Sequence, residues 1–265
     1  MHPVTAHHIR TEIDGDGIAT ITIDRLEKRN AMTYAMLAAF TEQVAAAGSD
    51  ERVRVVIVTG AGGAFCAGTD LADLATIPGE TRGTRGAAHE DQKWWPLIRC
   101  PKPVIGAVDG FAVGMGAEFT SQCDVRIATT RARFAWNFAH RGLVPDTGAG
   151  SWLLPRLIGP SQALRLLYSG AFLEAQDALA IGYVAELVAP DVLADAARAE
   201  ARRYLASSPL SLRHMKALVW QGLERDVGRH MSAHVEALTA CFRSEDHKEG
   251  VASFLERRPA KFTGR

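Results

Sequence analysis

Two short apolar runs, each followed by a turn rich in glycine and alanine, constrain the fold of this chain more than any other feature. The first run is VRVVIVTG (Val53–Gly60) and the second is PVIGAV (Pro103–Val108). A near-continuous apolar run of this length is typical of a strand buried on both faces of a parallel sheet. A helical segment follows each turn, so the order strand, loop, helix, strand predicts βαβ units and an α/β core.

Other segments extend this pattern. We expect a strand at Ile18–Ile23, another at Val125–Ala128, and a helix that begins at Thr33 and ends at Gly48. The helix is indicated by apolar residues that recur at three- and four-residue spacing. The polar, glycine-rich segment GETRGTRGA (79–87) predicts a mobile loop, and such loops often border binding sites.

After Pro190 the sequence shows helical patterns, and patterns typical of strands become rare. The helices expected beyond this point are Asp191–Leu205, Leu210–Gly222, Val227–Cys241 and Asp246–Arg257. We therefore expect an α/β core over residues 1–200 and a helical C-terminal region over residues 201–265. A chain of 265 residues is long enough for one large domain or for a main domain with a small one.

Charge and cysteine usage exclude several classes of function. Thirty basic and thirty acidic residues cancel, so no basic excess points to a nucleic-acid partner. The four cysteines lie far apart without C-x-x-C spacing, which argues against a zinc site, any other metal site or a disulfide framework. The N-terminal segment has no apolar core of a signal peptide, and no run reaches ~18 apolar residues. We expect a cytoplasmic protein with no membrane partner.

Three loops are candidates for carrying chemistry. AFCAGTDL (64–71) follows the first buried strand, and GFAVGMGAEF (110–119) follows the second. Small residues there let a ligand approach the backbone, and free N–H groups at the start of a helix point outward. In open α/β sheets, ligands bind beyond the carboxyl ends of the strands, where both loops would lie. The third loop, HRGLVPDTGAG (140–150), carries Asp146 just before a helix.

Taken singly, these loops are weak signals. TGAGGAF does not match the dinucleotide-binding fingerprint, because Phe65 stands where the third glycine is needed. An isolated Glu118 is more often a surface carboxylate, and an isolated Asp146 is more often a turn or helix-cap residue.

Together, the segments resemble the crotonase superfamily, the enoyl-CoA hydratase/isomerase family. The resemblance covers nearly the whole chain and is carried, in order, by EKRNAM, VVIVTGAGGAFCAGTDL, PKPVIGAVDGFAVGMGAEF, GLVPDTGAGSWLLPRLIG and EGVASFLERRPAKF. It implies an α/β fold, a crotonase-like spiral of ββα/βαβ turns with a helical C-terminal trimerisation region. It also implies that the chain assembles as a homotrimer or hexamer.

The resemblance also implies an oxyanion hole made of two backbone N–H groups. It assigns them to Thr69 in the first motif and to Met115 in the glycine-rich turn, where many relatives have glycine. Because the donor is backbone, methionine keeps it, provided that Met115 can adopt the local φ/ψ. Such donors stabilise the negative charge of a thioester enolate, each contributing on the order of 3 kcal/mol.

Family hydratases use two glutamates, and Glu118 matches the first. The second position is Phe138 here, and a phenyl ring cannot orient a water molecule. Some family isomerases place a catalytic aspartate where this chain has Asp146. This favours Glu118 and Asp146 as an acid/base pair for double-bond isomerisation. A hydratase that uses Glu118 alone, a non-catalytic acyl-CoA-binding protein, and a thioester or C–C hydrolase remain open alternatives.

By the same resemblance, coenzyme A is a handle on the substrate and no separate cofactor is needed. The residues expected to bind the acyl-CoA are Arg29, Ala31, Ala67, Gly68, Asp70, Leu71, Phe111, Val113, Gly114, Phe138, Leu143, Lys261 and Phe262, with Arg29 near phosphate and the last two often acting across a subunit boundary. Trp94 and Trp95 lie either on the outer wall of the acyl pocket or in the core. Single residues do not identify the acyl group.

Overall fold

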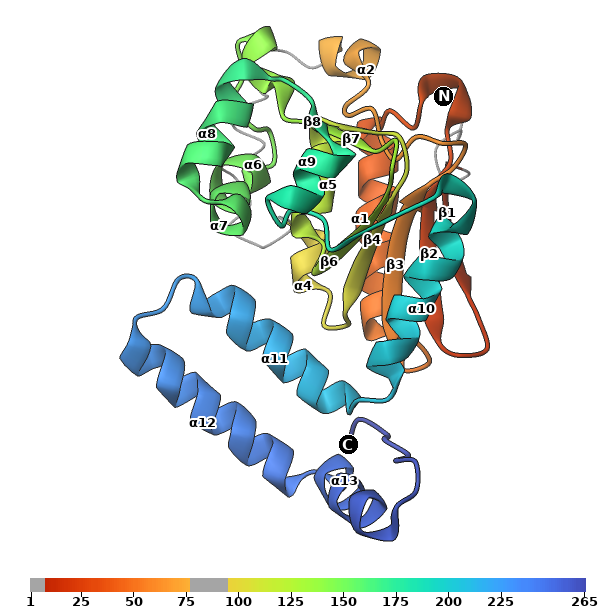
Figure 1. Cartoon of the computed structure of the whole chain (residues 1–265), viewed down its shortest axis with the longest axis vertical. Coiled ribbons are helices and arrows are strands. Elements are labelled where there is room, and N and C mark those ends of the chain that lie inside the picture. Colours follow the sequence, from red (N-terminus) through yellow and green to blue (C-terminus); the bar gives the residue numbers. More distant parts are fainter. Residues whose placement is uncertain (1–7, 77–94) are drawn as a thin grey trace.

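The computed structural model describes residues 8–76 and 95–265. An α/β body occupies one end of the molecule, and long C-terminal helices extend from the other (Figure 1). The loop expected at 79–87 and Trp94 lie outside the described residues.

The main sheet has six strands in the order β1-β2-β3-β4-β6-β9, and only the β1–β2 pair is antiparallel. The strands are β1 (Ile9–Ile13), β2 (Ile18–Ile23), β3 (Val55–Gly60), β4 (Val104–Val108), β6 (Val125–Thr129) and β9 (Glu186–Val188). The four strands expected from the sequence are confirmed to within two residues. β1 and β9 were not anticipated, because β1 is mostly exposed and β9 has only three residues.

A second, smaller sheet has the order β5-β7-β8. Its strands are β5 (Phe111–Val113), β7 (Arg133–Ala135) and β8 (Leu173–Glu174). The sequence predicts only a turn and a helix where β5 lies, because three residues are too few for a period-two pattern. β5 pairs in parallel with β7 and brings the second glycine-rich turn beside the first.

Helix α1 (Tyr34–Ser49) begins where the sequence predicts it, with the Thr33 side chain accepting a hydrogen bond from Met36 N–H. Phe40 of α1 packs against Phe119 of α5 (Met115–Gln122), with ring centroids 4.8 Å apart. Every residue of α5 is buried. The other helical segments before β9 are η2 (Leu26–Lys28), α2 (Leu71–Ala75), α4 (Pro96–Arg99), η3 (Asn137–Arg141), α6 (Ala149–Trp152), α7 (Leu154–Ile158), α8 (Pro160–Ser169) and α9 (Ala175–Ala180).

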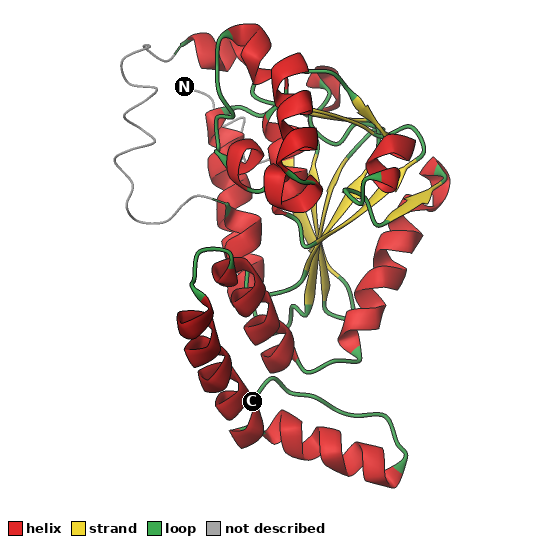
Figure 2. Cartoon of the chain, turned by 60° about the vertical axis from the view of Figure 1, so that its left-hand side comes forward, coloured by secondary structure: helices red, strands yellow, loops and turns green. Residues whose placement is uncertain are grey.

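Helices cover both sides of the main sheet (Figure 2). After η4 (Pro190–Val192), α10 (Leu193–Leu205) packs Leu193, Ala197 and Ala201 into a core cluster that also holds Ile57 and Ile105. The sequence boundary between residues 200 and 201 therefore falls inside a helix that lies on the sheet.

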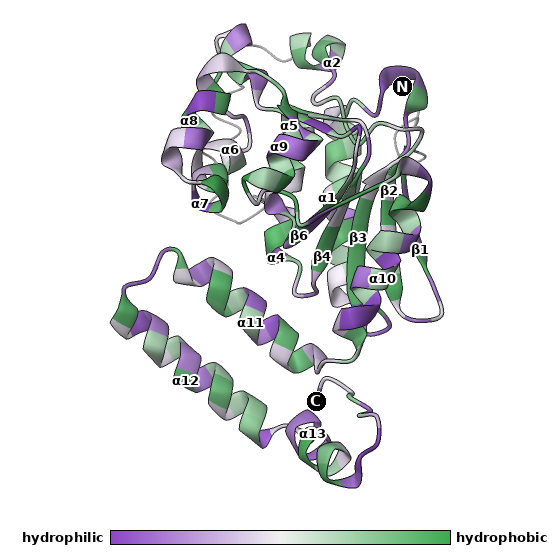
Figure 3. Ribbon diagram, viewed as in Figure 1, coloured by the Kyte–Doolittle hydropathy of each residue, from purple (hydrophilic) through white to green (hydrophobic). Residues whose placement is uncertain are grey.

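The last three helices leave the α/β body. They are α11 (Pro209–Gly222), α12 (Val227–Arg243) and α13 (Glu245–Glu256), close to the expected ranges. α11 and α12 lie side by side and carry alternating apolar and polar bands (Figure 3). Within the described parts of the chain, no helix combines the length and hydropathy needed to cross a bilayer.

Candidate functional site

Two backbone turns lie against each other at the end of the main sheet next to α2 (Figure 1). Cys66 pairs with Ala112 of β5, and Val113 N–H donates to Cys66 O at 2.9 Å. Gly68 has φ +100°, and a Cβ on it would stand 2.8 Å from Val113 O. A side chain at Gly68 would push the two turns apart, so glycine is needed at this contact.

The backbone on either side of Thr69 determines where its amide points. Met32 N–H donates to Gly68 O, and Asp70 N–H donates to Met32 O, both at 2.8 Å. This parallel bridge uses the groups that flank Thr69 and leaves its own N–H directed away from Met32.

Met115 is the first residue of α5, so its N–H has no partner within the helix. Gly114 before it takes the unusual conformation, with φ +54° and ψ −120°. Met115 itself has no positive φ, and its side chain is buried. Across residues 8–76 and 95–265, no hydrogen bond is donated by Thr69 N–H or Met115 N–H, so both amides remain free to bind a ligand oxygen.

Glu118 lies one turn further along α5 and is completely buried. Its Oε2 accepts hydrogen bonds from Thr147 N–H at 2.8 Å and Thr147 Oγ1 at 2.5 Å, and its Oε1 accepts one from Gly150 N–H at 2.6 Å. A Cβ on Gly150 would lie 3.0 Å from Glu118 Oε1 and equally close to Trp136. The glycine therefore lets the loop approach the carboxyl group.

Asp146 brings a second carboxyl group to Glu118, and the two interact through charge and a shared hydrogen bond. Thr69 Oγ1 donates to Asp146 Oδ2 at 3.2 Å. Asp146 does not cap α6, because the N-cap is Gly148 and no side chain caps that helix. The interpretation of Asp146 as a helix cap is therefore wrong. The residue lies in the turn that Gly148 N–H closes by donating to Pro145 O at 3.2 Å.

The carboxyl groups of Glu118 and Asp146 have different surroundings, which affect their pKa values differently. Burial, and then the negative charge of Asp146, raises the pKa of Glu118 to about 8. Burial also raises the pKa of Asp146, while hydrogen bonds from Glu118 and Thr69 lower it. Asp146 keeps accessible surface, so water screens part of the effect of burial there. We take Glu118 as the group that holds the proton near neutral pH and Asp146 as the ionised one.

Two aromatic side chains contact the backbone segments that carry these residues. The Phe138 ring of η3 lies 3.8 Å from the position of a Cβ on Gly114. Trp95 Nε1 donates to Thr147 O at 2.9 Å, so its indole holds the loop that carries both Asp146 and Thr147. Leu143 is exposed.

Of the residues expected near coenzyme A, some leave their side chains available to a ligand, whereas Asp70 already has partners within the protein. Ala67 N–H donates to Arg29 O at 3.1 Å, which brings these two next to each other, and Leu71 is exposed at the start of α2. The Asp70 side chain is occupied within the protein, because it caps α2 and pairs with Arg25 at 2.7 Å.

The Phe111 ring packs against Phe172 and Arg29. Its ring centroid lies 5.8 Å from that of Phe172 and 5.8 Å from the guanidinium carbon of Arg29. This arrangement associates Phe111 with Arg29.

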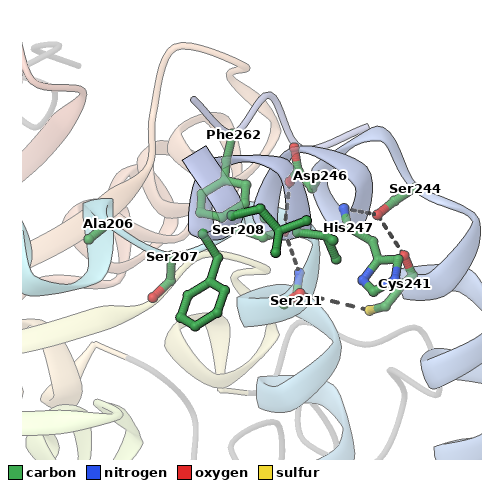
Figure 4. A pocket seen from close by; sticks show the side chains of 13 residues that line it. Ala206, Ser207, Ser208, Ser211, Cys241, Ser244, Asp246, His247 and Phe262 are labelled. Atoms are coloured by element: carbon green, nitrogen blue, oxygen red, sulfur yellow. Dashed lines mark hydrogen bonds between the residues drawn. The ribbon is translucent and has the colours of Figure 1, made fainter. Parts of the chain in front are cut away.

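Lys261 and Phe262 lie in the C-terminal tail, where Lys261 N–H donates to Glu249 at 2.7 Å. Phe262 lines a cavity of about 600 Å³ between α11, α12 and α13, together with Ser208, Ser211 and Asp246 (Figure 4). Glu118 and Asp146 do not line this cavity, and the C-terminal end lies at the opposite end of the molecule from α5 and α6 (Figure 1).

Sequence reasoning missed Thr147, Gly150 and the role of Trp95. Thr147 and Gly150 follow Asp146 in the segment PDTGAG, but threonine and glycine there are also ordinary turn residues. Only the packing of this loop against α5 shows that they bind Glu118.

Comparison with known proteins gives a consistent result. The family described as Enoyl-CoA hydratase/isomerase matches residues 14–265. The chain is 37% identical to Crotonyl-CoA hydratase of Syntrophomonas wolfei over 247 residues, which covers 92% of this chain and 94% of the relative. It is 34% identical to 1,2-epoxyphenylacetyl-CoA isomerase of Escherichia coli over 253 residues, with coverage of 94% and 96%.

Solved structures agree with the sequence comparison. The crystal structure of enoyl-CoA hydratase from Bacillus anthracis superimposes with a TM-score of 0.91 at 28% identity, covering 97% of this chain and 100% of the other. A crystal structure from Streptomyces coelicolor, titled a putative enoyl-CoA hydratase, has a TM-score of 0.89 at 32% identity and full coverage of both chains. The expected crotonase-like α/β fold with a helical C-terminal region is thereby confirmed, and the chain belongs to the enoyl-CoA hydratase/isomerase family of the crotonase superfamily.

Proposed function

We propose that this enzyme isomerises a carbon–carbon double bond in an acyl-CoA, with Glu118 and Asp146 as its acid/base pair. One observation supports this most: two interacting carboxyl groups lie close to free backbone N–H groups, since Glu118 follows Met115 in α5 and Asp146 accepts a hydrogen bond from the Thr69 side chain. Titratable groups whose environments separate their pKa values are typical of acid/base pairs.

The reaction divides into two proton transfers. The thioester oxygen accepts hydrogen bonds from Thr69 and Met115 N–H, which stabilise the enolate when a proton leaves the adjacent carbon chain. Ionised Asp146 takes that proton, and the electron pair of the broken C–H bond shifts the double bond and charges the oxygen. Glu118 then donates its proton to a different carbon, and the proton on Asp146 passes to Glu118 through their shared hydrogen bond.

Coenzyme A serves as the handle of this substrate. The proposed contacts are Arg29, Ala31, Ala67, Gly68 and Leu71 along the handle, and Val113, Gly114, Phe138 and Leu143 along the acyl group. The family resemblance places Phe111 along the acyl group, but we assign it to the handle, because its ring lies beside Arg29. Asp70 acts by shaping the first turn. All four cysteines are free thiols, which fits a reducing compartment such as the cytoplasm.

Hydration is the second candidate, because relatives such as that of Syntrophomonas wolfei are named hydratases. Glu118 alone would then activate water. Phe138 weighs against this reaction, since its ring offers no hydrogen bond to orient the water molecule.

The deciding experiment incubates the protein with a panel of enoyl-, dienoyl- and hydroxyacyl-CoAs and identifies products by mass and chromatography. Isomerisation leaves the mass unchanged, whereas hydration adds one water. Glu118→Gln and Asp146→Asn should each lower isomerase turnover by ~10²–10⁴-fold while acyl-CoA binding persists. Full activity of Asp146→Asn would leave Glu118 as a single base. If neither variant nor the wild type turns over any substrate, acyl-CoA binding without catalysis becomes the better account.

We further propose that the chain assembles as a trimer or a pair of trimers. Large apolar side chains stay exposed along α11, α12 and α13, including Val219, Val235 and Phe254. In such an assembly, Lys261 and Phe262 would reach the substrate of a neighbouring subunit, which would explain their distance from Glu118 in one chain.

A further inference from the structure

Thr69 has two polar groups that bear on the proposed reaction, a backbone N–H and a side-chain hydroxyl. Its backbone N–H is one of the two free amides, and its side-chain hydroxyl donates to Asp146 Oδ2 at 3.2 Å. Any residue other than proline at this position would supply the backbone N–H. The contact with Asp146 requires a hydroxyl group, and it joins the first glycine-rich turn to the loop that carries Asp146.

Hydrogen-bond accounting around Glu118 shows why this contact matters. Oε2 accepts from both N–H and Oγ1 of Thr147, which uses both of its lone pairs. Oε1 accepts from Gly150 N–H, which leaves it one position for the proton of the neutral acid. Glu118 therefore has its full set of partners as a neutral acid.

Asp146 has the opposite set of partners. It receives the hydrogen bond from Glu118 and the one from Thr69, and both suit an ionised carboxylate. The charged or titratable groups that face Asp146 among the described residues are Glu118 and the buried Cys66 thiol. Burial raises the pKa of Cys66 to about 12, so the thiol stays neutral. Burial raises the pKa of Asp146, and the hydrogen bonds from Glu118 and Thr69 are the strongest of the interactions that lower it.

We propose that the Thr69 side chain is a positioning residue that holds Asp146 ionised and at a fixed place relative to the oxyanion hole. This inference rests on the proposed isomerase function. The same residue donates its N–H to the thioester oxygen and its hydroxyl to Asp146. The position of Asp146 relative to the bound thioester oxygen is therefore fixed. A substrate bound through its thioester then presents its acidic carbon at a set distance from Asp146.

The test compares Thr69→Val, which keeps size and backbone, with Thr69→Ser, which keeps the hydroxyl. Thr69→Val should lower kcat about 10- to 100-fold, the effect of losing one hydrogen bond to a charged group, and leave KM within about threefold because the amide remains. Thr69→Ser should recover most of that loss. The acid limb of the pH profile of kcat/KM should move to higher pH in Thr69→Val, because the carboxylate has lost a donor.

Two controls separate the explanations. Thr41→Val removes a hydroxyl that bonds within α1, to Leu37 O at 2.9 Å, and should leave kcat and the pH profile unchanged. In an Asp146→Asn background, Thr69→Val should cost little more, because its effect passes through Asp146.

Three results would overturn the inference: equal losses in the valine and serine variants, a change in KM alone, or the same loss with and without the Asp146 carboxylate. Wild-type activity in Asp146→Asn would instead reject the proposed function. Circular dichroism of each variant checks that it has folded.

Discussion

At the scale of single residues, the site depends on a carboxyl group that the fold keeps away from water. Glu118 has no accessible surface, and no cation pairs with it among the described residues. A buried unpaired charge costs several kcal/mol, so the group takes a proton instead. Its three hydrogen-bond donors, from Thr147 and Gly150, fix the orientation of the carboxyl group.

This burial makes stability depend on pH. The pKa of Glu118 is 4.5 ordinarily and about 8 in the folded chain, raised first by burial and then by Asp146. Between these values the folded state binds more protons than the unfolded state, so the free energy of unfolding falls as pH rises from about 4.5 to about 8. Glu118→Gln cannot titrate and should escape this loss.

Denaturant titrations of wild type and Glu118→Gln at several pH values and one protein concentration measure the effect. The variant should gain stability relative to wild type from pH 5 to pH 8, approximately, and the difference should level off above that range. All other titrating groups are common to both proteins. A difference that stays flat or has the opposite sign would show that Glu118 is ionised in the folded protein.

At the scale of elements, the site is a junction between two turns that follow neighbouring strands. β5 has only three residues, yet its Ala112 pairs with Cys66, so the turns that carry Thr69 and Met115 lie next to each other. The exchange of glycine for Met115 is tolerated because Gly114 takes the positive φ. Met115 therefore adopts the local backbone conformation without a positive φ.

The junction gives a prediction with a matched control. Gly68→Ala places a Cβ 2.8 Å from Val113 O at φ +100°, so it should separate the turns and lower kcat by at least ~10²-fold, as for a lost oxyanion donor. Gly182→Ala meets nothing within 4 Å at φ +74° and should cost only the backbone strain, ~1 kcal/mol of stability, with normal kcat. Steady-state kinetics and thermal unfolding of both variants test this. Equal kinetics would mean that the close contact at Gly68 does not shape the oxyanion hole.

Sequence patterns predict the elements that bury a long apolar face. β3, β4 and α1 appear because apolar residues repeat over six or more positions or run unbroken. β5 and β9 are not predicted, because a strand of three residues is too short to show an alternating pattern. The motifs predict Glu118 and Asp146 as candidate site residues. The hydrogen bond from Thr147 to Glu118 depends on how the 145–150 loop packs on α5, which no local pattern encodes.

At the scale of the whole molecule, the α/β body and the C-terminal helices differ in how they bury apolar surface. α10 is seated on the sheet, whereas α11, α12 and α13 leave large apolar side chains in solvent (Figure 3). These are Met215, Val219, Val227, Met231, Val235, Leu238, Phe242, Val251, Phe254 and Leu255. We expect these side chains to be covered by other subunits, because large exposed apolar patches are typical of protein–protein interfaces.

Light scattering at micromolar concentration should therefore give a mass of three or six chains of 28.6 kDa. Phe254, 82% exposed on α13, is a sensitive probe, because a charge buried in an interface is strongly unfavourable. Phe254→Glu should shift the mass towards that of the single chain. Tyr168→Glu, at a 74% exposed position on α8, should not change it. If Lys261 and Phe262 act on a neighbour's substrate, KM for the acyl-CoA should rise together with dissociation. A wild-type protein that remains at 28.6 kDa would exclude both the trimer and this shared site.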